Sequence, residues 1–404
     1  MLSNCILLAR VFSVIRSRGQ TVDVARKILI LARESGVKLE LEDIQNTPFL
    51  PKPCLDTPDN DSFFKSLEEP SFRAKQLLKW IHQKGVIDFD EMTDFNKPLR
   101  AKLKEVAFMK PPIIEESFLS PEGTKKYLIK LDSGTMIEMV RIPEKKRATL
   151  CISSQAGCAL QCTFCATGAQ GFEKNLTSDE IIGQLWLANF GESENIPITN
   201  VVFMGMGEPL LNFNPVIESA KIMKDQMGYG LSRKRITIST SGIVPQIDSI
   251  ANNVDVSLAI SLHASNNQLR DEIVPINKKY PIEKLIKSCM DYISFYDGKR
   301  NITIEYILID GVNDSKEQAY ELCKLLSDLS CKINLIPFNP FDGSDYKRSN
   351  KLNIQNFKDI LVKKGFITTL RVTRGDAVDG ACGQLVGKLK KSIKGKNLIN
   401  AREI

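Results

Sequence analysis

Histidine is scarce in this chain, with only His82 and His263 among 404 residues. An enzyme that relied on histidine for acid–base chemistry would have few groups to use. Long apolar runs are also missing, since none approaches the roughly 20 residues that a membrane-spanning helix requires. We therefore expect no membrane span. The length of the chain allows two or three domains.

Cysteine, in contrast, is plentiful, with ten in the chain. No convincing secretory signal accompanies them, so their number does not indicate a disulfide scaffold. They are typical of a reducing, cytoplasmic compartment and of thiol or metal chemistry. The net charge of +7 permits an RNA partner but does not by itself require one.

Three of the cysteines, Cys158, Cys162 and Cys165, share one loop with the spacing Cys-x-x-x-Cys-x-x-Cys. A [4Fe–4S] cluster normally takes four cysteine ligands, so three leave one iron open for a substrate or cofactor. A structural zinc site needs four ligands in paired spacings, and no second Cys-x-x-Cys or His pair follows the loop. Cys151 as a fourth ligand would close the site, and the residues alone leave that alternative open.

Strand-like and helix-like segments alternate along the chain after this loop, with helical patterns at 178–190 and 215–227. A hairpin around 132–134 precedes the loop. The candidate strands are 126–131, 136–142, 148–153, 200–204, 235–239, 254–262, 302–309, 333–338 and 368–372. Alternation of this kind favours an α/β fold with a parallel sheet, a partial barrel, and functional groups at the carboxyl ends of the strands.

The cysteine loop, which a glycine (Gly168) closes, resembles the signature of the radical S-adenosylmethionine (SAM) enzymes. Over about residues 70–390 the chain resembles, more narrowly, the RlmN/Cfr family of radical SAM RNA methyltransferases. The motifs that carry this likeness are 205–210, 239–242, 261–264, 336–340 and 374–385. The resemblance implies a partial (β/α)6 radical SAM barrel with a small N-terminal helical accessory domain. It also implies a [4Fe–4S] cluster on Cys158, Cys162 and Cys165, with SAM as cofactor.

Polar residues and glycines follow several candidate strands. Glu208 offers an anion for a ligand ammonium, and two glycines before it allow close approach of the backbone. An isolated Ser or Asn at a strand end is more often a turn cap. The resemblance assigns the SAM contacts to Gly207, Glu208, Ser239, Ser261, Leu262, His263 and Asn339.

Two cysteines outside the loop, Cys151 and Cys382, lie within recognisable family motifs. Carbon 2 of adenine lies between two ring nitrogens and is not nucleophilic, so direct transfer of an electrophilic methyl group is unfavourable. By the resemblance, two SAM molecules are used: Cys382 accepts a methyl group, which radical chemistry then joins to adenine. Cys151 releases the product by forming a disulfide bond with Cys382, and Glu138 takes the ring proton.

The substrates implied by the resemblance are 23S rRNA, at an adenosine near the peptidyl-transferase centre, and tRNA, at the adenosine beside the anticodon. Target bases in loops are easier to unstack than paired ones. A reductant such as flavodoxin or ferredoxin is implied too, and we expect a monomer. Two alternatives stay open: a Cfr-like enzyme that methylates carbon 8, and a retired RNA-binding iron–sulfur protein.

The N-terminal part differs from the family pattern. Residues from about 20 to 69 resemble a late segment of homoserine dehydrogenase, through 22–34, 50–55 and 62–69. No Gly-rich dinucleotide fingerprint is present, so we expect no dehydrogenase activity. The first 22 residues contain no acid and three arginines, which also fits a transit peptide.

Residues 72–84 have helical periodicity, with Gly85 at the expected C-terminal cap. The basic face of this helix is either a solvated surface or, by the resemblance, an RNA contact. A basic C-terminal tail presents the same two alternatives. The predicted domains are a non-catalytic extension (1–69), the helical accessory domain (70–110), the methyltransferase domain (111–390) and the tail (391–404).

Overall fold

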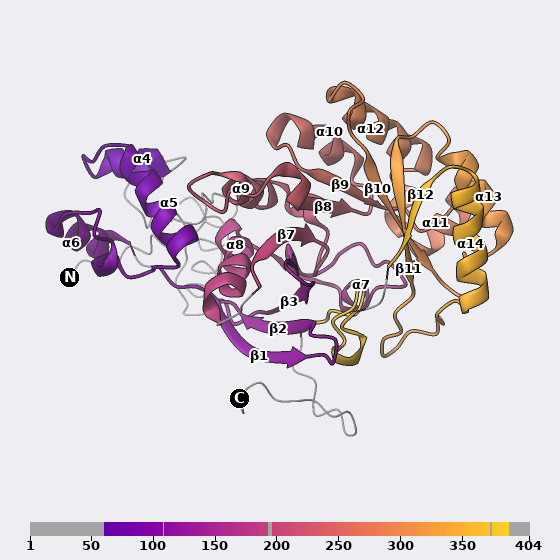
Figure 1. The fold of residues 1–404 in the computed structure, drawn as a ribbon, viewed down its shortest axis with the longest axis horizontal. Helices are drawn as coiled ribbons and strands as arrows, with labels where there is room; N and C mark the ends of the chain where they lie inside the picture. Colours follow the sequence, from indigo (N-terminus) through magenta and orange to yellow (C-terminus); the bar gives the residue numbers. More distant parts are fainter. Residues whose placement is uncertain (1–59, 108, 193–195, 372–373, 388–404) are drawn as a thin grey trace, which may run out of the picture. The chain divides into compact units, whose positions relative to one another are not determined.

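The computed structural model describes residues 60–107, 109–192, 196–371 and 374–387. The chain divides into two compact units, one of Met1–Lys110 with Thr177–Asp179 and one of Pro111–Leu176 with Glu180–Ile404 (Figure 1). Most of the segment that resembles homoserine dehydrogenase, the stretch that fits a transit peptide and the predicted tail lie outside the described residues. The predicted domain boundaries stay predictions.

The first unit is helical where it is described. Its elements are α4 (Asn60–Ser66), α5 (Phe72–Lys84), η2 (Phe89–Glu91) and α6 (Lys97–Val106). The expected cap of α5 is present, because Gly85 adopts the left-handed conformation at φ 68° and its N–H bonds the Trp80 carbonyl. Helix α4 contacts α5, and Phe64 and Leu77 are buried there, although residue 64 falls in the stretch predicted as an extension.

The second unit is built on one ten-stranded sheet, in the order β1-β2-β3-β4-β7-β8-β9-β10-β11-β12. Strands β1 to β4 are antiparallel neighbours and β4 to β12 are parallel neighbours. Their bounds are β1 (Ile113–Leu119), β2 (Lys125–Lys130), β3 (Met136–Pro143), β4 (Ala148–Cys151), β7 (Ile198–Phe203), β8 (Ile236–Thr240), β9 (Ser257–Ser261), β10 (Ile302–Leu308), β11 (Cys331–Pro337) and β12 (Ile367–Leu370). A separate hairpin joins β5 (Gln155–Gly157) and β6 (Phe172–Asn175). The predicted α/β fold with a parallel sheet is confirmed. The sheet has seven parallel strands where the resemblance implied six units, and the seventh, β12, corresponds to the candidate strand at 368–372.

Helices connect the parallel strands and lie around the outside of the sheet, as Figure 1 shows for α10, α12, α13 and α14. The helices are α7 (Ala166–Gln170), α8 (Ser178–Trp186), α9 (Phe213–Lys224), α10 (Val244–Asn253), α11 (Asn267–Ile273), α12 (Ile282–Phe295), α13 (Lys316–Leu325) and α14 (Lys351–Lys363). Every residue of β10 is buried, as expected for a parallel strand covered on both faces. Among the described helices, none is long and apolar enough to cross a bilayer.

One buried arginine fastens the carboxyl ends of β8 and β9. Arg270, in α11, is fully buried and donates to the carbonyls of Ser241, Ser261 and Leu262 at 2.6, 3.2 and 3.0 Å. It also donates to the Asn277 side chain at 2.9 Å. Buried backbone carbonyls just beyond the end of a strand have no partner in the sheet. They need such donors, because leaving a buried carbonyl without a hydrogen bond costs folding free energy. The strand ends are therefore held in one arrangement.

The substitution Arg270→Met tests this role, because it keeps an unbranched apolar stem and removes every donor. It should lower the free energy of unfolding by about 3 kcal/mol or more, since several buried acceptors lose their partner. Denaturant titration followed by circular dichroism measures the change. Arg300→Gln is the control, because Arg300 pairs with the partly exposed Asp255 and its loss should cost about 1 kcal/mol or less. Equal, small losses in the two variants would contradict the role of Arg270.

Candidate active site

The three-cysteine loop lies between β5 and α7 and lines a cavity with the carboxyl ends of the parallel strands. We call it the first cavity. Gly157 begins the loop at φ 71°, and a Cβ there would lie 1.9 Å from the Gly171 carbonyl oxygen. Only glycine fits this position, because β5 and the end of α7 come so close. Cys158, Cys162 and Cys165 all face the first cavity.

Burial controls the chemistry of these thiols. It raises the pKa of Cys158 to about 12, and it raises the pKa of Cys162 and of Cys165, with mutual repulsion of the neighbouring cysteines adding to the effect. Thiolates there need a nearby positive charge, and bound iron supplies one. No three His, Cys, Asp or Glu side chains of the described residues are placed to ligate a single ion. The cysteines of a [4Fe–4S] cluster bind separate irons, so this donor set fits a cluster held by three cysteines.

The glycines after β7 are explained by contacts within the chain. A Cβ on Gly205 would lie 2.6 Å from the Ile152 carbonyl oxygen, and one on Gly207 would lie 2.4 Å from the Gln155 Cβ. The sequence pattern led us to expect an approach to a ligand. Close packing on the segment that leads into the cysteine loop is the stronger reason, although both glycines also line the first cavity.

Glu208 presents a buried carboxylate to the first cavity. Its Oε2 accepts the Ser241 N–H at 2.8 Å and its Oε1 accepts the Leu210 N–H at 3.1 Å. Burial raises its pKa, and these hydrogen bonds oppose the rise. A carboxylate has further lone pairs after two such bonds, and a bound ammonium would favour the ionised form. The site therefore fits the ammonium group of a ligand.

Ser239, Ser261 and His263 also line the first cavity, from the ends of β8 and β9, whereas Leu262 is buried behind it. His263 has a left-handed backbone at φ 62°. Its Nδ1 accepts the Ile307 N–H at 3.0 Å, which puts the ring proton on Nε2. Burial lowers the pKa of His263 to about 3, so it is a neutral donor and not a proton shuttle.

A second cavity lies beside the first and contains Cys151, Cys382 and Asn339. Cys382 lines both cavities, with Met204, Ile336, Arg371 and Leu385. Cys151 and Cys382 are free thiols in the structure, so the predicted disulfide bond is not supported. Burial raises the pKa of Cys151 to about 12, and the neighbouring Cys382 adds to the rise.

Glu138 lies in neither cavity lining. It is on β3, almost fully buried, and its Oε1 lies 3.2 Å from the Lys126 Nζ. Its Oε2 accepts the Val386 N–H at 3.0 Å. The structure thus connects Glu138 to the segment that carries Cys382 but does not bring its carboxylate to the cavities.

Two functional candidates were missed by the sequence reasoning. Arg371 follows β12 and lines both cavities, 4.0 Å from the Glu305 Oε2. The neighbouring Cys382 is the largest cause that raises the pKa of Arg371, and Glu305 and Cys151 add to it. Glu305 is a buried carboxylate on β10 whose pKa is raised by burial. The position of Arg371 at the end of the last strand was a usable signal, whereas Glu305 lies inside a strand and gave none.

Comparisons with known sequence families agree with this site. Residues 55–109 match the ribosomal RNA large subunit methyltransferase N-terminal domain. Residues 152–323, which include the cysteine loop, match the radical SAM superfamily. The chain is 54% identical over 340 residues to a dual-specificity RNA methyltransferase RlmN of Pseudomonas putida, covering 83% of this chain and 89% of that protein.

A second relative, the dual-specificity RNA methyltransferase RlmN of Pseudomonas entomophila, is 54% identical over 337 residues, covering 81% of this chain and 88% of that protein. Among solved structures, a radical SAM methyltransferase from Sphaerobacter thermophilus is similar with a TM-score of 0.75 and 38% identity. The likeness covers 81% of this chain and 96% of that one. The family models thus match the helical unit and the part of the chain that carries the cysteine loop, and the relatives match about four-fifths of the whole chain.

Two cysteine variants distinguish a cluster with an open iron from a closed one. Protein purified without oxygen should hold about four irons, as a [4Fe–4S] cluster does. Cys162→Ala should lose them, because it removes a ligand from the loop. Cys151→Ala should keep them, because Cys151 lines the second cavity and not the first. Iron analysis and the visible absorption spectrum measure the cluster content of the two variants. Equal loss of iron in Cys151→Ala would make Cys151 the fourth ligand.

Proposed function

The chain belongs to the RlmN family of radical SAM RNA methyltransferases, and from that premise we propose that it methylates carbon 2 of adenosine in 23S rRNA and in tRNA. Carbon 2 lies between two ring nitrogens and is a poor nucleophile. A methyl group must therefore reach it by a route other than direct polar transfer, and a protein thiol that carries the carbon provides one.

The first cavity holds the cofactors in this proposal. Cys158, Cys162 and Cys165 ligate the [4Fe–4S] cluster, and Glu208 accepts the ammonium of SAM. Ser239, Ser261 and the neutral His263 supply further polar contacts, and Gly207 and the buried Leu262 shape the wall behind them. When bound, the cluster and SAM supply methyl groups and reductive radical chemistry.

Cys382 carries the methyl carbon. The observation that supports this most strongly is that Cys382 lines both cavities. A carrier must meet the cofactor on one side and the substrate base on the other. Sulfur accepts a methyl group readily as a thiolate, and Arg371 places a positive charge beside it.

Cys151 releases the product in this proposal. It shares the second cavity with Cys382, so its sulfur can attack that of Cys382 after the carbon has joined the base: a disulfide bond forms, the bond between sulfur and the transferred carbon breaks, and that carbon stays on adenine and takes a proton. The reductant then returns the disulfide to two thiols. Burial keeps Cys151 protonated in the resting enzyme, because its pKa is raised to about 12. It must therefore lose its proton during turnover, and Arg371, in the same cavity, would stabilise the resulting thiolate.

Glu138 is the proposed acceptor of the ring proton. Its Oε2 is engaged by the Val386 N–H, four residues after Cys382. For Glu138 to act, this segment must shift and free that oxygen. Asn339, on the wall of the second cavity, is a SAM contact by family resemblance, and it also donates to the Cys382 carbonyl at 3.1 Å.

The second cavity receives the adenine in this proposal, and Arg371 and Arg374 supply cations on its wall. A base reaches such a site only after it leaves its stack, which costs a few kcal/mol and is cheapest in RNA loops. Electrons come from a reductant such as flavodoxin or ferredoxin, and we propose that the enzyme acts as a monomer.

The first test is mass spectrometry of nucleosides from 23S rRNA and tRNA incubated with the reconstituted enzyme, SAM and a chemical reductant. We expect 2-methyladenosine in both RNAs. Cys382→Ala should abolish it, because no thiol then carries the carbon. Methylation at carbon 8 would support the Cfr-like alternative, and no methylation at all would support a retired enzyme.

The second test separates the roles of the two outlying cysteines. Cys151→Ala should still add carbon to the RNA but not release it, so protein joined to RNA through Cys382 should accumulate. Gel electrophoresis after nuclease trimming and mass spectrometry of the peptide measure this adduct. Cys382→Ala should give neither adduct nor product. A Cys151→Ala enzyme that turns over normally would contradict the assignment.

A further inference from the structure

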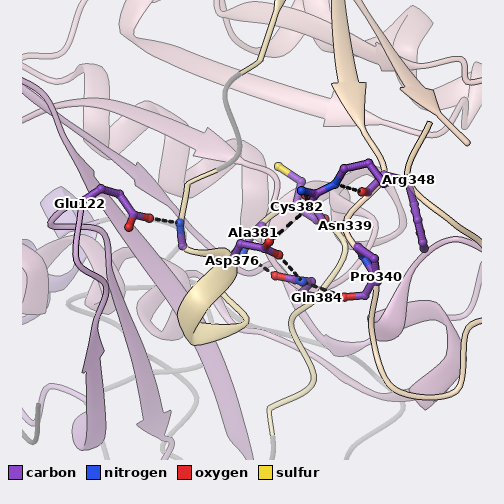
Figure 2. Close-up of polar contacts among 10 residues, drawn as sticks. Glu122, Asn339, Pro340, Arg348, Asp376, Ala381, Cys382 and Gln384 are labelled. Carbon is purple, nitrogen blue, oxygen red and sulfur yellow. Dashed lines mark hydrogen bonds and ion pairs between the residues drawn. The ribbon is translucent and has the colours of Figure 1, made fainter. Parts of the chain in front are cut away.

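A set of polar side chains joins the Cys382 segment to the turn after β11 (Figure 2). We call Asn339, Arg348, Asp376 and Gln384 the Cys382 clamp. Gln384 is 4% exposed and uses both ends of its amide. Its Nε2 donates to the Pro340 carbonyl at 2.9 Å and to Asp376 Oδ1 at 3.1 Å, and its Oε1 accepts the Ala381 N–H at 3.1 Å.

Arg348 holds the other side of the clamp. Its Nε donates to the Phe338 carbonyl at 2.8 Å, and its Nη2 donates to Asn339 Oδ1 at 3.0 Å. Since the Asn339 oxygen is bound to a cation, the Asn339 Nδ2 faces the Cys382 carbonyl, 3.1 Å away. Arg348 also lies 3.3 Å from Asp376 Oδ2, but this pair is more than a third exposed and contributes little by itself.

These contacts meet the backbone on either side of the Cys382 Cα. The Ala381 N–H is bound by Gln384, and the Cys382 carbonyl is bound by Asn339. In Figure 2 the Cys382 sulfur points away from the dashed contacts. The clamp therefore fixes the backbone from which the Cys382 side chain extends. It leaves the sulfur free to face the two cavities that Cys382 lines.

We propose that Gln384 and Arg348 are positioning residues that hold the backbone of Cys382 between the two cavities. The proposal rests on the proposed function, because it takes Cys382 as the methyl carrier. Loss of these contacts should have an effect that the loosening of an unrelated loop would not have. A displaced carrier leaves in place the loop cysteines and the residues proposed to bind SAM in the first cavity, and of the proposed SAM contacts only Asn339 belongs to the clamp, so cofactor cleavage continues while delivery of carbon to RNA fails.

The test uses the full-length, cluster-loaded enzyme and measures 5′-deoxyadenosine formed per methyladenosine. In Gln384→Glu, Oε1 still accepts the Ala381 N–H, but the other oxygen faces the Pro340 carbonyl and the Asp376 carboxylate. Repulsion should open the clamp. We expect iron content near that of the wild type and a ratio raised by about tenfold or more, because small misplacements of reacting groups cost up to about 10²-fold.

Rescue supplies a second readout. Asp376→Asn in the Gln384→Glu background removes the facing carboxylate and provides a donor, so the ratio should fall part of the way back. Arg348→Gln should raise the ratio as Gln384→Glu does, and Arg348→Lys should raise it less. Gln318→Glu is the matched control: the Gln318 Nε2 also donates to a backbone carbonyl, that of Val312 at 2.8 Å, but Gln318 belongs to the capping box of α13 and lines neither cavity, so the same loss there should leave the ratio unchanged.

Hydrogen exchange of the segment 375–386 tests the clamp without any activity. Exchange should be faster in Gln384→Glu and Arg348→Gln than in the wild type, and unchanged in Gln318→Glu. Unchanged exchange and an unchanged ratio in both clamp variants would overturn the proposal. Loss of iron and of SAM cleavage in both would also overturn it, since the contacts would then support the cluster loop. If the wild type makes no methyladenosine, the proposed function fails, and hydrogen exchange still tests the clamp.

Discussion

Burial of three thiols on one loop is the constraint on which the rest of this structure depends. Thiols in an apolar pocket hold their protons, as the raised pKa values of Cys158, Cys162 and Cys165 show. Bound iron would supply the positive charge that lets them ionise, and the three side chains line one pocket that the fold holds in place. Gly157, the close approach of Gly205 to Ile152, and the strand ends fastened by Arg270 each contribute to that fixed pocket.

The helix that follows the cysteine loop also contacts the segment that carries Cys382. The Ala166 N–H, at the start of α7, donates to the Gly383 carbonyl at 2.7 Å, and the Thr167 hydroxyl donates to the Leu385 carbonyl at 2.6 Å. The segment of Cys382 is therefore attached to the helix that follows Cys165, the last cysteine of the loop. The cysteine loop and the proposed carrier are therefore joined through these two hydrogen bonds, in addition to the contacts of the Cys382 clamp.

The sequence was most informative where chemistry or periodicity repeats over several residues. Alternating strands and helices predicted the parallel sheet, and the Gly85 cap was found because a left-handed residue ends helices in a recognisable way. Pairings between distant residues were not accessible. Nothing near Arg270 in the sequence indicates that its guanidinium reaches the ends of two strands, and nothing near Gln384 indicates Pro340. Such contacts depend on the folded arrangement, so a local pattern cannot encode them.

Glu138 shows how the resting arrangement opposes the proposed reaction. Its carboxylate is buried beside Lys126 and bound to the Val386 N–H, so both oxygens have partners in the protein. A buried carboxylate without such partners would be costly or protonated. In the resting arrangement these partners hold the Glu138 carboxylate away from both cavities, and so away from the adenine whose ring proton it is proposed to accept. Because Val386 and Cys382 belong to one segment, a shift of Cys382 that carried Val386 with it would break this hydrogen bond, and in the proposed function that shift would free Glu138 to accept the ring proton.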